Sequence, residues 1–337
     1  MKTTSIRLEA SSHCQLRCPS CPTTTGAIHP AIGSGFLALG DFEALLQANP
    51  QLRQIELSNY GEIFLNPAMV DIFRVAHERG VALNAGNGVN LNQASGAALE
   101  ALVKYQVRSL SCSIDGASQA SYAKYRVRGD FDTVLANVRR INAYKRAYGS
   151  RYPRLAWQFV AFGHNQQEVP AARALAADLG MEFRLKLSWD AEFSPLQDLE
   201  GARRELGGAT RAEYRERRGE DYMEAICHQL WDEPQINWDG KLLGCSRNFW
   251  GDFGPANAFK DGLDAALAGE KLEDAKALLL GRGAPRADIP CSSCAIYLER
   301  KSAGRRLRRP LPPYRWLRRL WRWSGLGRLR AGLWPGA

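Results

Sequence analysis

Three cysteines near the N-terminus are the residues of this chain whose types and spacing most suggest chemistry. Cys14, Cys18 and Cys21 have the spacing C-x3-C-x2-C and directly follow an alternating apolar run. Thiolates at this spacing on one loop can converge on one metal centre, and sulfur ligands suit zinc or an iron–sulfur cluster. A structural zinc site needs four ligands, so a zinc interpretation requires His13 or His29 as the fourth. The alternative is a cluster with one position left open.

A second set of four cysteines lies in the last third of the chain. Cys227, Cys245, Cys291 and Cys294 have the spacing C-x17-C-x45-C-x2-C. A close pair with two distant partners is typical of a closed four-thiolate site, either a zinc ribbon or an iron–sulfur cluster. The one remaining cysteine, Cys112, stands in an apolar strand pattern and is predicted to be a small buried structural residue.

The elements that must position the first cysteines form a regular alternation. Strand patterns occur at residues 4–10, 52–58, 81–85, 107–115, 154–162 and 181–188, and helical patterns occur at 41–49, 67–80, 95–105, 129–147 and 165–180. This alternation predicts an α/β fold with a parallel sheet and right-handed crossovers. Six βα units fit an open, partial (β/α)6 TIM-like barrel or a doubly wound sheet. In both folds the chemistry lies at the carboxyl ends of the strands, where the first cysteine loop begins.

The rest of the chain divides into a small module and a tail. Residues 190–224 form a polar bridging segment with one predicted surface helix, and "PQINWDGKLLGC" is typical of a hairpin with Asp239-Gly240 at its turn. We therefore predict a barrel over residues 1–200 and a module with a β-hairpin and a helix over 201–300. A basic tail follows over 301–337.

The composition is that of an ordinary globular protein, with 45% apolar and 24% charged residues. The N-terminal "MKTTSIRLEASSH" lacks the apolar core of a signal peptide, and the chain has no apolar run of about 18 residues. We therefore expect a cytoplasmic protein. In that reducing compartment, clustered cysteines serve as metal ligands or catalytic groups rather than disulfides.

The net charge of +10 belongs to the tail. From Lys301 onward the chain has one Lys, ten Arg and no acid, so the first 300 residues carry about −1 and are not expected to bind nucleic acid. Tyr314–Trp323 interleaves Arg with Trp and Leu, which is typical of an amphipathic helix at an anionic membrane surface. We expect peripheral contact with the inner face of the membrane. Docking on the body, nucleic-acid binding by the tail, and disorder are the alternatives.

The first cysteine motif resembles that of the radical SAM enzymes, whose C-x3-C-x2-C loop follows the first strand of a partial barrel. The resemblance implies that Cys14, Cys18 and Cys21 hold a [4Fe-4S] cluster by three irons. The fourth iron is then left for the amino and carboxyl groups of S-adenosylmethionine. Ser20 departs from the family pattern, because many members have an aromatic residue at this position.

The same resemblance implies cofactor-binding residues after the second and fourth strands. "SNYGEIFLNP" is similar to the family's Gly-Gly-Glu-Pro segment, which contacts the methionine amino group, and "SCSIDGAS" is similar to its Ser-x-Asp-Gly segment. An arginine shortly afterwards is expected at the methionine carboxylate, with Arg128 as the alternative to Arg126. The implied cofactor-binding residues are Gly61, Glu62, Ser113, Asp115 and Arg126.

The second cysteine set resembles the C-terminal extension called SPASM, or its shortened form called twitch. Four cysteines imply one auxiliary [4Fe-4S] cluster, as in the aminocyclitol dehydrogenase of the butirosin pathway and related carbohydrate-modifying members. Related epimerases donate a hydrogen atom from a free cysteine. Cys112 is expected to face the helices if Ser111 and Ser113 face the barrel, which argues against that role.

The resemblance implies a 5′-deoxyadenosyl radical that abstracts hydrogen from the substrate, with oxidation as the expected outcome. Oxidation of an alcohol also needs a base, for which Asp190 and Glu192 follow the sixth strand, with Lys186 as an alternative. The auxiliary cluster is the expected electron acceptor, and a flavodoxin or ferredoxin is the expected electron donor.

The substrate is expected to be a small molecule, a sugar or a glycolipid. Peptide-modifying members often begin with a leader-binding domain, whereas this chain enters the barrel by about residue 5. Radical epimerisation and peptide maturation are the alternatives within the family. A non-catalytic zinc protein whose tail binds nucleic acid or a partner is the alternative of a different class.

Overall fold

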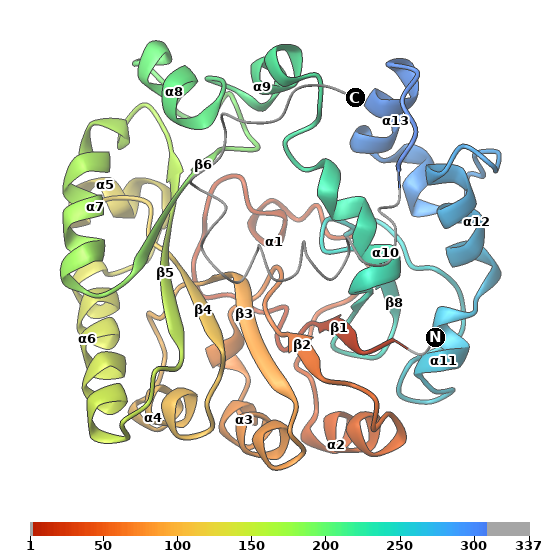
Figure 1. The fold of residues 1–337 in the computed structure, drawn as a ribbon, viewed down its shortest axis with the longest axis horizontal. Coiled ribbons are helices and arrows are strands. Elements are labelled where there is room, and N and C mark those ends of the chain that lie inside the picture. Colours follow the sequence, from red (N-terminus) through yellow and green to blue (C-terminus); the bar gives the residue numbers. More distant parts are fainter. Residues whose placement is uncertain (1–2, 309–337) are drawn as a thin grey trace.

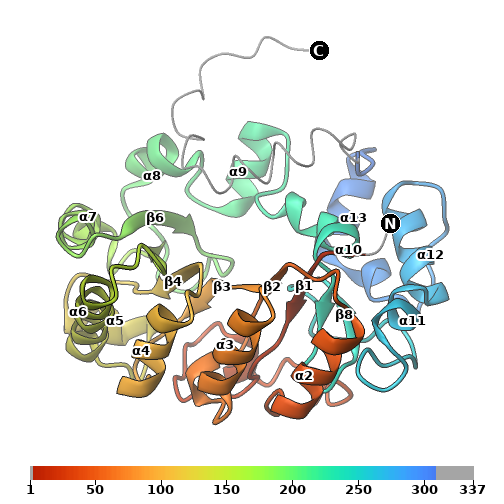
Figure 2. The ribbon, with the colours of Figure 1, turned by 60° about the horizontal axis from the view of Figure 1, so that its bottom comes forward.

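The structure, a computed structural model, describes residues 3–308. Six parallel strands pair in sequence order and form an open arc (Figure 2). They are β1 (Ser5–Leu8), β2 (Gln54–Glu56), β3 (Ala82–Val89), β4 (Ser109–Ser113), β5 (Arg154–Ala161) and β6 (Glu182–Leu187). The predicted α/β partial barrel is therefore confirmed, and the doubly wound alternative is not, because the strands keep their chain order from β1 to β6.

Helices cover the convex side of this arc (Figures 1 and 2). They are α2 (Leu39–Ala48), α3 (Met69–Glu78), α4 (Gly96–Lys104), α5 (Gln119–Tyr125), α6 (Phe131–Ala147) and α7 (Val169–Asp178). All but the short α5 were predicted from their apolar spacing. Local capping sets where they begin, since Ser95 accepts a hydrogen bond from the Ala98 amide and Asp130 accepts one from the Thr133 amide.

Side chains along the strands alternate between an apolar outer face and a polar interior. Ile6, Ile55 and Trp157 are buried in the core beneath the helices. Between them, polar side chains pair across the barrel: Arg184 Nη1 donates to Ser111 Oγ at 3.2 Å. Cys112 is fully buried in the apolar core, so its predicted burial is confirmed. The polar interior is what a barrel that admits a polar ligand requires.

Two helices, rather than one, follow β6. They are α8 (Leu199–Leu206) and α9 (Arg211–Arg218). The single predicted surface helix is divided because Gly207 takes a left-handed conformation with φ of 83°, which ends α8. The Thr210 side chain then accepts a hydrogen bond from the Glu213 amide and starts α9. Both helices lie on the open side of the strand arc (Figure 2).

The predicted hairpin forms, and it joins the barrel sheet. Strands β7 (Gln235–Ile236) and β8 (Leu242–Gly244) are antiparallel, as "WDG" at their turn predicts. β7 also pairs in parallel with β1, through Arg7 opposite Gln235 and Leu8 opposite Ile236. The sheet therefore has eight strands in the described residues, in the order β6-β5-β4-β3-β2-β1-β7-β8.

Short helices complete the C-terminal part. They are η3 (Glu224–His228), α10 (Gln229–Asp232), α11 (Leu263–Leu267), α12 (Glu270–Leu279), η4 (Pro290–Ser293) and α13 (Ala295–Ser302). Helices α8 and α13 cross the sequence-based boundaries at residues 200 and 300. The tail's first residues pack back on the body, because the Leu307 amide donates to the Leu279 carbonyl at 3.1 Å.

The predicted amphipathic helix at Tyr314–Trp323 lies outside the described residues. No helix within residues 3–308 is long and apolar enough to cross a lipid bilayer.

Candidate active site

A cavity of about 280 Å³ lies at the carboxyl ends of the six strands. Its wall takes side chains from the loops after β1 and β2, from the ends of β3 to β6, and from the chain between residues 211 and 247. The last of these segments closes the open side of the strand arc. Polar groups from distant parts of the chain therefore converge on one concave space, as in most small-molecule sites.

The first cysteine set lines this cavity. Cys14, Cys18 and Cys21 all lie on the loop between β1 and α2, and all three contribute to the wall. The loop folds back on itself, since the Cys21 amide donates to the Cys18 carbonyl at 3.0 Å, and Pro22 starts the short helix α1 (Pro22–Thr25). Burial raises the pKa of Cys14 to about 12, and charge on the neighbouring thiols adds to the effect. The three thiols thus share one wall of the cavity.

Neither candidate histidine joins these thiols. The His13 ring packs against Phe36, with centroids 4.7 Å apart, and His29 Nδ1 accepts from the Ala31 amide at 3.2 Å. Neither side chain lines the cavity. In the part of the chain that the structure describes, the fourth protein ligand required by the zinc interpretation is therefore not at the first cysteine set.

Arg126 lies directly beside this set. Its Nη1 is 3.7 Å from Cys18 Sγ, and its Nε donates to Asp115 Oδ2 at 2.6 Å. Asp115 is fully buried and accepts the Val160 amide through its other oxygen at 2.7 Å. Asp115 does not itself line the cavity, so it positions Arg126. Arg128 is exposed and does not line the cavity. Of the two arginines that the sequence offered for the methionine carboxylate, the structure therefore places only Arg126 at the cavity.

Gly61 and Glu62 occupy the cavity wall after β2. A Cβ on Gly61 would stand 1.9 Å from the Ser11 carbonyl oxygen, so only glycine fits against the cysteine loop. Glu62 is 1% exposed and accepts amide hydrogen bonds from Asn90 at 2.5 Å and Phe64 at 3.3 Å. Burial raises its pKa to about 7. Ser113 also lines the cavity.

The two predicted catalytic acids lie outside the cavity wall. Glu192 is exposed, whereas Asp190 Oδ2 accepts a hydrogen bond from Ser20 Oγ at 2.5 Å. Ser20 is the residue that departs from the family's aromatic pattern, and it lies between two of the thiols. Lys186, the alternative base, does line the cavity. The contact of Asp190 is therefore with the cysteine loop.

We predict that Asp190→Ala loosens the first cysteine set. Loss of the Ser20 contact should weaken metal retention by about tenfold, as for other partners that orient metal ligands. Iron remaining after timed exposure to a chelator measures this. Glu192→Ala is the matched control, because its side chain is exposed two residues away. Equal iron loss in both variants would remove the positioning role of Asp190.

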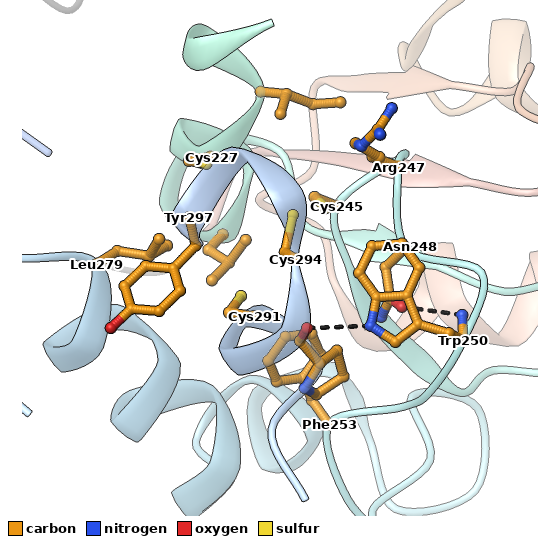
Figure 3. Close-up of a pocket in the computed structure, with 13 residues that line it drawn as sticks. Cys227, Cys245, Arg247, Asn248, Trp250, Phe253, Leu279, Cys291, Cys294 and Tyr297 are labelled. Atoms are coloured by element: carbon orange, nitrogen blue, oxygen red, sulfur yellow. Dashed lines mark hydrogen bonds between the residues drawn. The ribbon is translucent and has the colours of Figure 1, made fainter. Parts of the chain in front are cut away.

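The second cysteine set surrounds its own small cavity of about 20 Å³ (Figure 3). Cys227 comes from η3, Cys245 follows β8, Cys291 lies in η4, and Cys294 begins α13. The segments are held together by Trp250, whose Nε1 donates to the Pro290 carbonyl at 3.0 Å. Three regions that are distant in sequence, one of which carries both Cys291 and Cys294, thus bring their thiols to one cavity.

The donor sets decide which groups these two sites fit. No three His, Cys, Asp or Glu side chains among residues 3–308 already stand at metal-holding distance. The lining of the second cavity contains four thiols and no carboxylate or imidazole, which fits a closed centre with soft ligands. The first set has three thiols beside a roomy polar cavity, which fits a cluster with one open position.

Comparison with known proteins adds to this geometry. No protein-family model matches the sequence, and no curated protein is a significant relative. Among solved structures, the radical SAM enzyme SuiB of Streptococcus suis, bound to S-adenosylmethionine, superposes with a TM-score of 0.61. The match covers 88% of this chain and 71% of SuiB at 13% identity. This chain has the radical SAM fold.

Further matches have the same low identity. SuiB bound to its precursor peptide SuiA superposes with a TM-score of 0.59 over 88% of this chain and 70% of SuiB, at 12% identity. BtrN in complex with AdoMet and 2-DOIA has a TM-score of 0.49, with 88% of this chain and 94% of BtrN covered at 13% identity. Similarity at this identity concerns the fold, so function has to be argued from the chain's own residues.

Several residues of the large cavity carry no sequence motif. Trp189, Arg211, Tyr222 and Arg247 all line it, mostly from the segments that close the barrel. Tyr60 links the loop after β2 to the segment after β8, because its hydroxyl donates to the Arg247 carbonyl at 3.0 Å. A local pattern could not have indicated these residues, since each reaches the cavity only through long-range packing.

The two cavities of this radical SAM fold share a wall. Ile226 and Arg247 line both the large cavity and the small one between the second cysteines. Arg247 follows Cys245 by two residues, and Figure 3 shows its guanidinium directed away from the four cysteines. The second cysteine set is therefore adjacent to the space where a ligand would lie.

Proposed function

We propose that this protein is a radical SAM enzyme. The observation that carries the proposal is that Cys14, Cys18 and Cys21 line one cavity with Glu62 and Arg126 at the carboxyl ends of the strands. When bound, a [4Fe-4S] cluster and S-adenosylmethionine supply a radical that removes hydrogen from an unactivated C–H bond, and an auxiliary cluster supplies an acceptor for one electron.

Each residue at the first site has a proposed role. The three thiols hold the cluster. Arg126, fixed by Asp115 at 2.6 Å, receives the methionine carboxylate. The Glu62 carboxyl receives the methionine amino group, next to Gly61, where a side chain would close the approach. Ser113 is proposed to lie beside the bound cofactor.

At the second site, we propose that Cys227, Cys245, Cys291 and Cys294 hold one auxiliary [4Fe-4S] cluster. Support comes from the four thiols in the lining, which has no carboxylate or imidazole, and from the wall shared with the large cavity. A zinc ion fits the same four thiols, so metal analysis has to separate the two. A flavodoxin or ferredoxin is the proposed electron donor.

The proposed reaction is oxidation of a small molecule, a sugar or a glycolipid. Lys186 is the proposed proton acceptor, because it lines the cavity, whereas Asp190 and Glu192 do not. An unaltered oxidation rate in Lys186→Met would exclude it. Membrane contact through the tail is proposed as well, and liposome flotation with and without residues 304–337 tests it.

A peptide substrate is the second candidate, because SuiB, whose fold this chain shares, is described with a bound precursor peptide. Radical epimerisation of the small-molecule substrate is a further alternative. Product formed in heavy water separates the outcomes. Deuterium gained at carbon would indicate epimerisation, and a new carbonyl would indicate oxidation.

Anaerobic purification and reconstitution test the proposed function. We expect a brown protein with about eight iron atoms per chain, the content of two [4Fe-4S] clusters. Reduction with dithionite in the presence of S-adenosylmethionine should release 5′-deoxyadenosine. A colourless protein with zinc at both sites and no 5′-deoxyadenosine would overturn the proposal and favour the non-catalytic alternative.

A further inference from the structure

Two arginines face the large cavity from the segments that close the barrel. Arg211 begins α9, and Arg247 follows β8. The Nε atoms of both side chains are buried, and neither has a hydrogen-bond partner within residues 3–308. A buried N–H group without a partner is costly, and native proteins usually satisfy it with a protein group, a water or a ligand.

The Arg211 guanidinium is held in place rather than loose. Its Nη2 donates to the Leu187 carbonyl at 3.2 Å, and its central carbon lies 5.0 Å from the centroid of the Tyr222 ring. Both Leu187 and Tyr222 line the same cavity. Burial lowers the pKa of Arg211 and the charge of Arg247 lowers it further, whereas Tyr222 and Asp221 raise it. Both arginines line the same cavity.

The balance of charge around the cavity is positive. Its wall contains three guanidinium groups, from Arg126, Arg211 and Arg247, the amine of Lys186, and one carboxyl group, from Glu62. Arg126 is already paired with Asp115. No ion pair within 4.0 Å joins Arg211 or Arg247 to any acid of the described chain. Two guanidinium groups that line one cavity, each with a buried Nε that lacks a partner among residues 3–308 and neither in such an ion pair, favour an anion as the group that completes the site.

We propose that Arg211 and Arg247 bind an anionic group of the substrate, either a carboxylate or a phosphate. Guanidinium is the side chain best suited to both groups, because its planar fork can donate two parallel hydrogen bonds to them. The inference rests on the proposed function only in assigning the anion to a substrate, because the two arginines themselves define the anion site. The substrate class is therefore an acidic small molecule or an acidic conjugate, held by its charge on the barrel's closing segments.

Calorimetric titration of the reconstituted holoenzyme tests the site, with inorganic phosphate and acetate as separate probes. We expect saturable binding of at least one probe, and binding weaker by about tenfold or more in Arg211→Gln and in Arg247→Gln. Arg211→Lys keeps the charge but not the fork, so it should restore part of the lost affinity. The stronger probe identifies the kind of anionic group.

Arg218→Gln is the matched control, because Arg218 lies exposed on the same helix and does not line the cavity. Its probe affinity should equal that of the unaltered protein. The proposal is overturned if neither probe binds, or if all variants bind alike. Iron content and circular dichroism identify a variant that fails to fold, and Arg211→Lys then carries the test. Release of 5′-deoxyadenosine by the unaltered protein reports separately on the proposed function, so the two can fail independently.

Discussion

Replacing Cys18 by alanine is expected to abolish release of 5′-deoxyadenosine and to remove about four iron atoms per chain, the content of one [4Fe-4S] cluster. Cys18 is 6% exposed, and its Sγ lies 3.7 Å from Arg126 Nη1, so no solvent-exposed group can take its place. The rate should fall by on the order of a thousandfold or more, equivalent to about 4 kcal/mol in the activation barrier. Iron analysis and chromatography of the reaction mixture measure both effects.

Cys112→Ala provides the control for this prediction. Cys112 is fully buried in the apolar core and lines neither cavity, so its loss should cost a small amount of stability and no iron. If Cys18→Ala kept its full iron content, or if Cys112→Ala lost as much, the assignment of the first cysteine set would be wrong.

Replacing Cys245 by alanine should have the second largest effect, and a different one. We expect the loss of about four iron atoms together with a lower melting temperature, because a centre held by four segments contributes its binding free energy to folding. The other three thiols lie in η3, in η4 and just before α13, and they come close to Cys245 only when the chain folds. Release of 5′-deoxyadenosine without substrate should persist, because the first cysteine set is intact.

Ser293→Ala is the matched control for the second set. Ser293 lies between Cys291 and Cys294, and its hydroxyl makes one long hydrogen bond of 3.4 Å to the Pro290 carbonyl. Its iron content and melting temperature should be those of the unaltered protein. Zinc, rather than iron, released in stoichiometric amount by Cys245→Ala would contradict the auxiliary cluster and leave only a structural metal site.

Much of the barrel could be predicted because strand and helix patterns are local. Residues 154–162 form a mostly apolar run between two helical patterns, and the structure has β5 at Arg154–Ala161. The division of the bridging segment into α8 and α9 could not be predicted with equal ease. It depends on Gly207 adopting a left-handed conformation, which many glycines in loops do not need.

The candidate site shows the same division. Gly61, Glu62 and Arg126 stand in motifs beside strand ends, and the parallel sheet brings strand ends together, so their meeting could be predicted. Asp190 also follows a strand end, yet its carboxylate accepts a hydrogen bond from Ser20 and does not line the cavity. Position along the chain does not decide which way a loop side chain turns, because that depends on the partner it finds.

The sequence by itself determined the alternation of strands and helices and the grouping of seven cysteines into one set of three and one set of four. These depend on the period of apolar side chains and on the number of ligand-bearing residues, which a chain carries before it folds. Only the tertiary structure decided that β7 pairs with β1, that Arg247 lines both cavities, and that Arg211 and Arg247 line one cavity, each with a buried Nε that has no partner among the described residues. These contacts join residues far apart in the chain, and the packing that closes the barrel determines them.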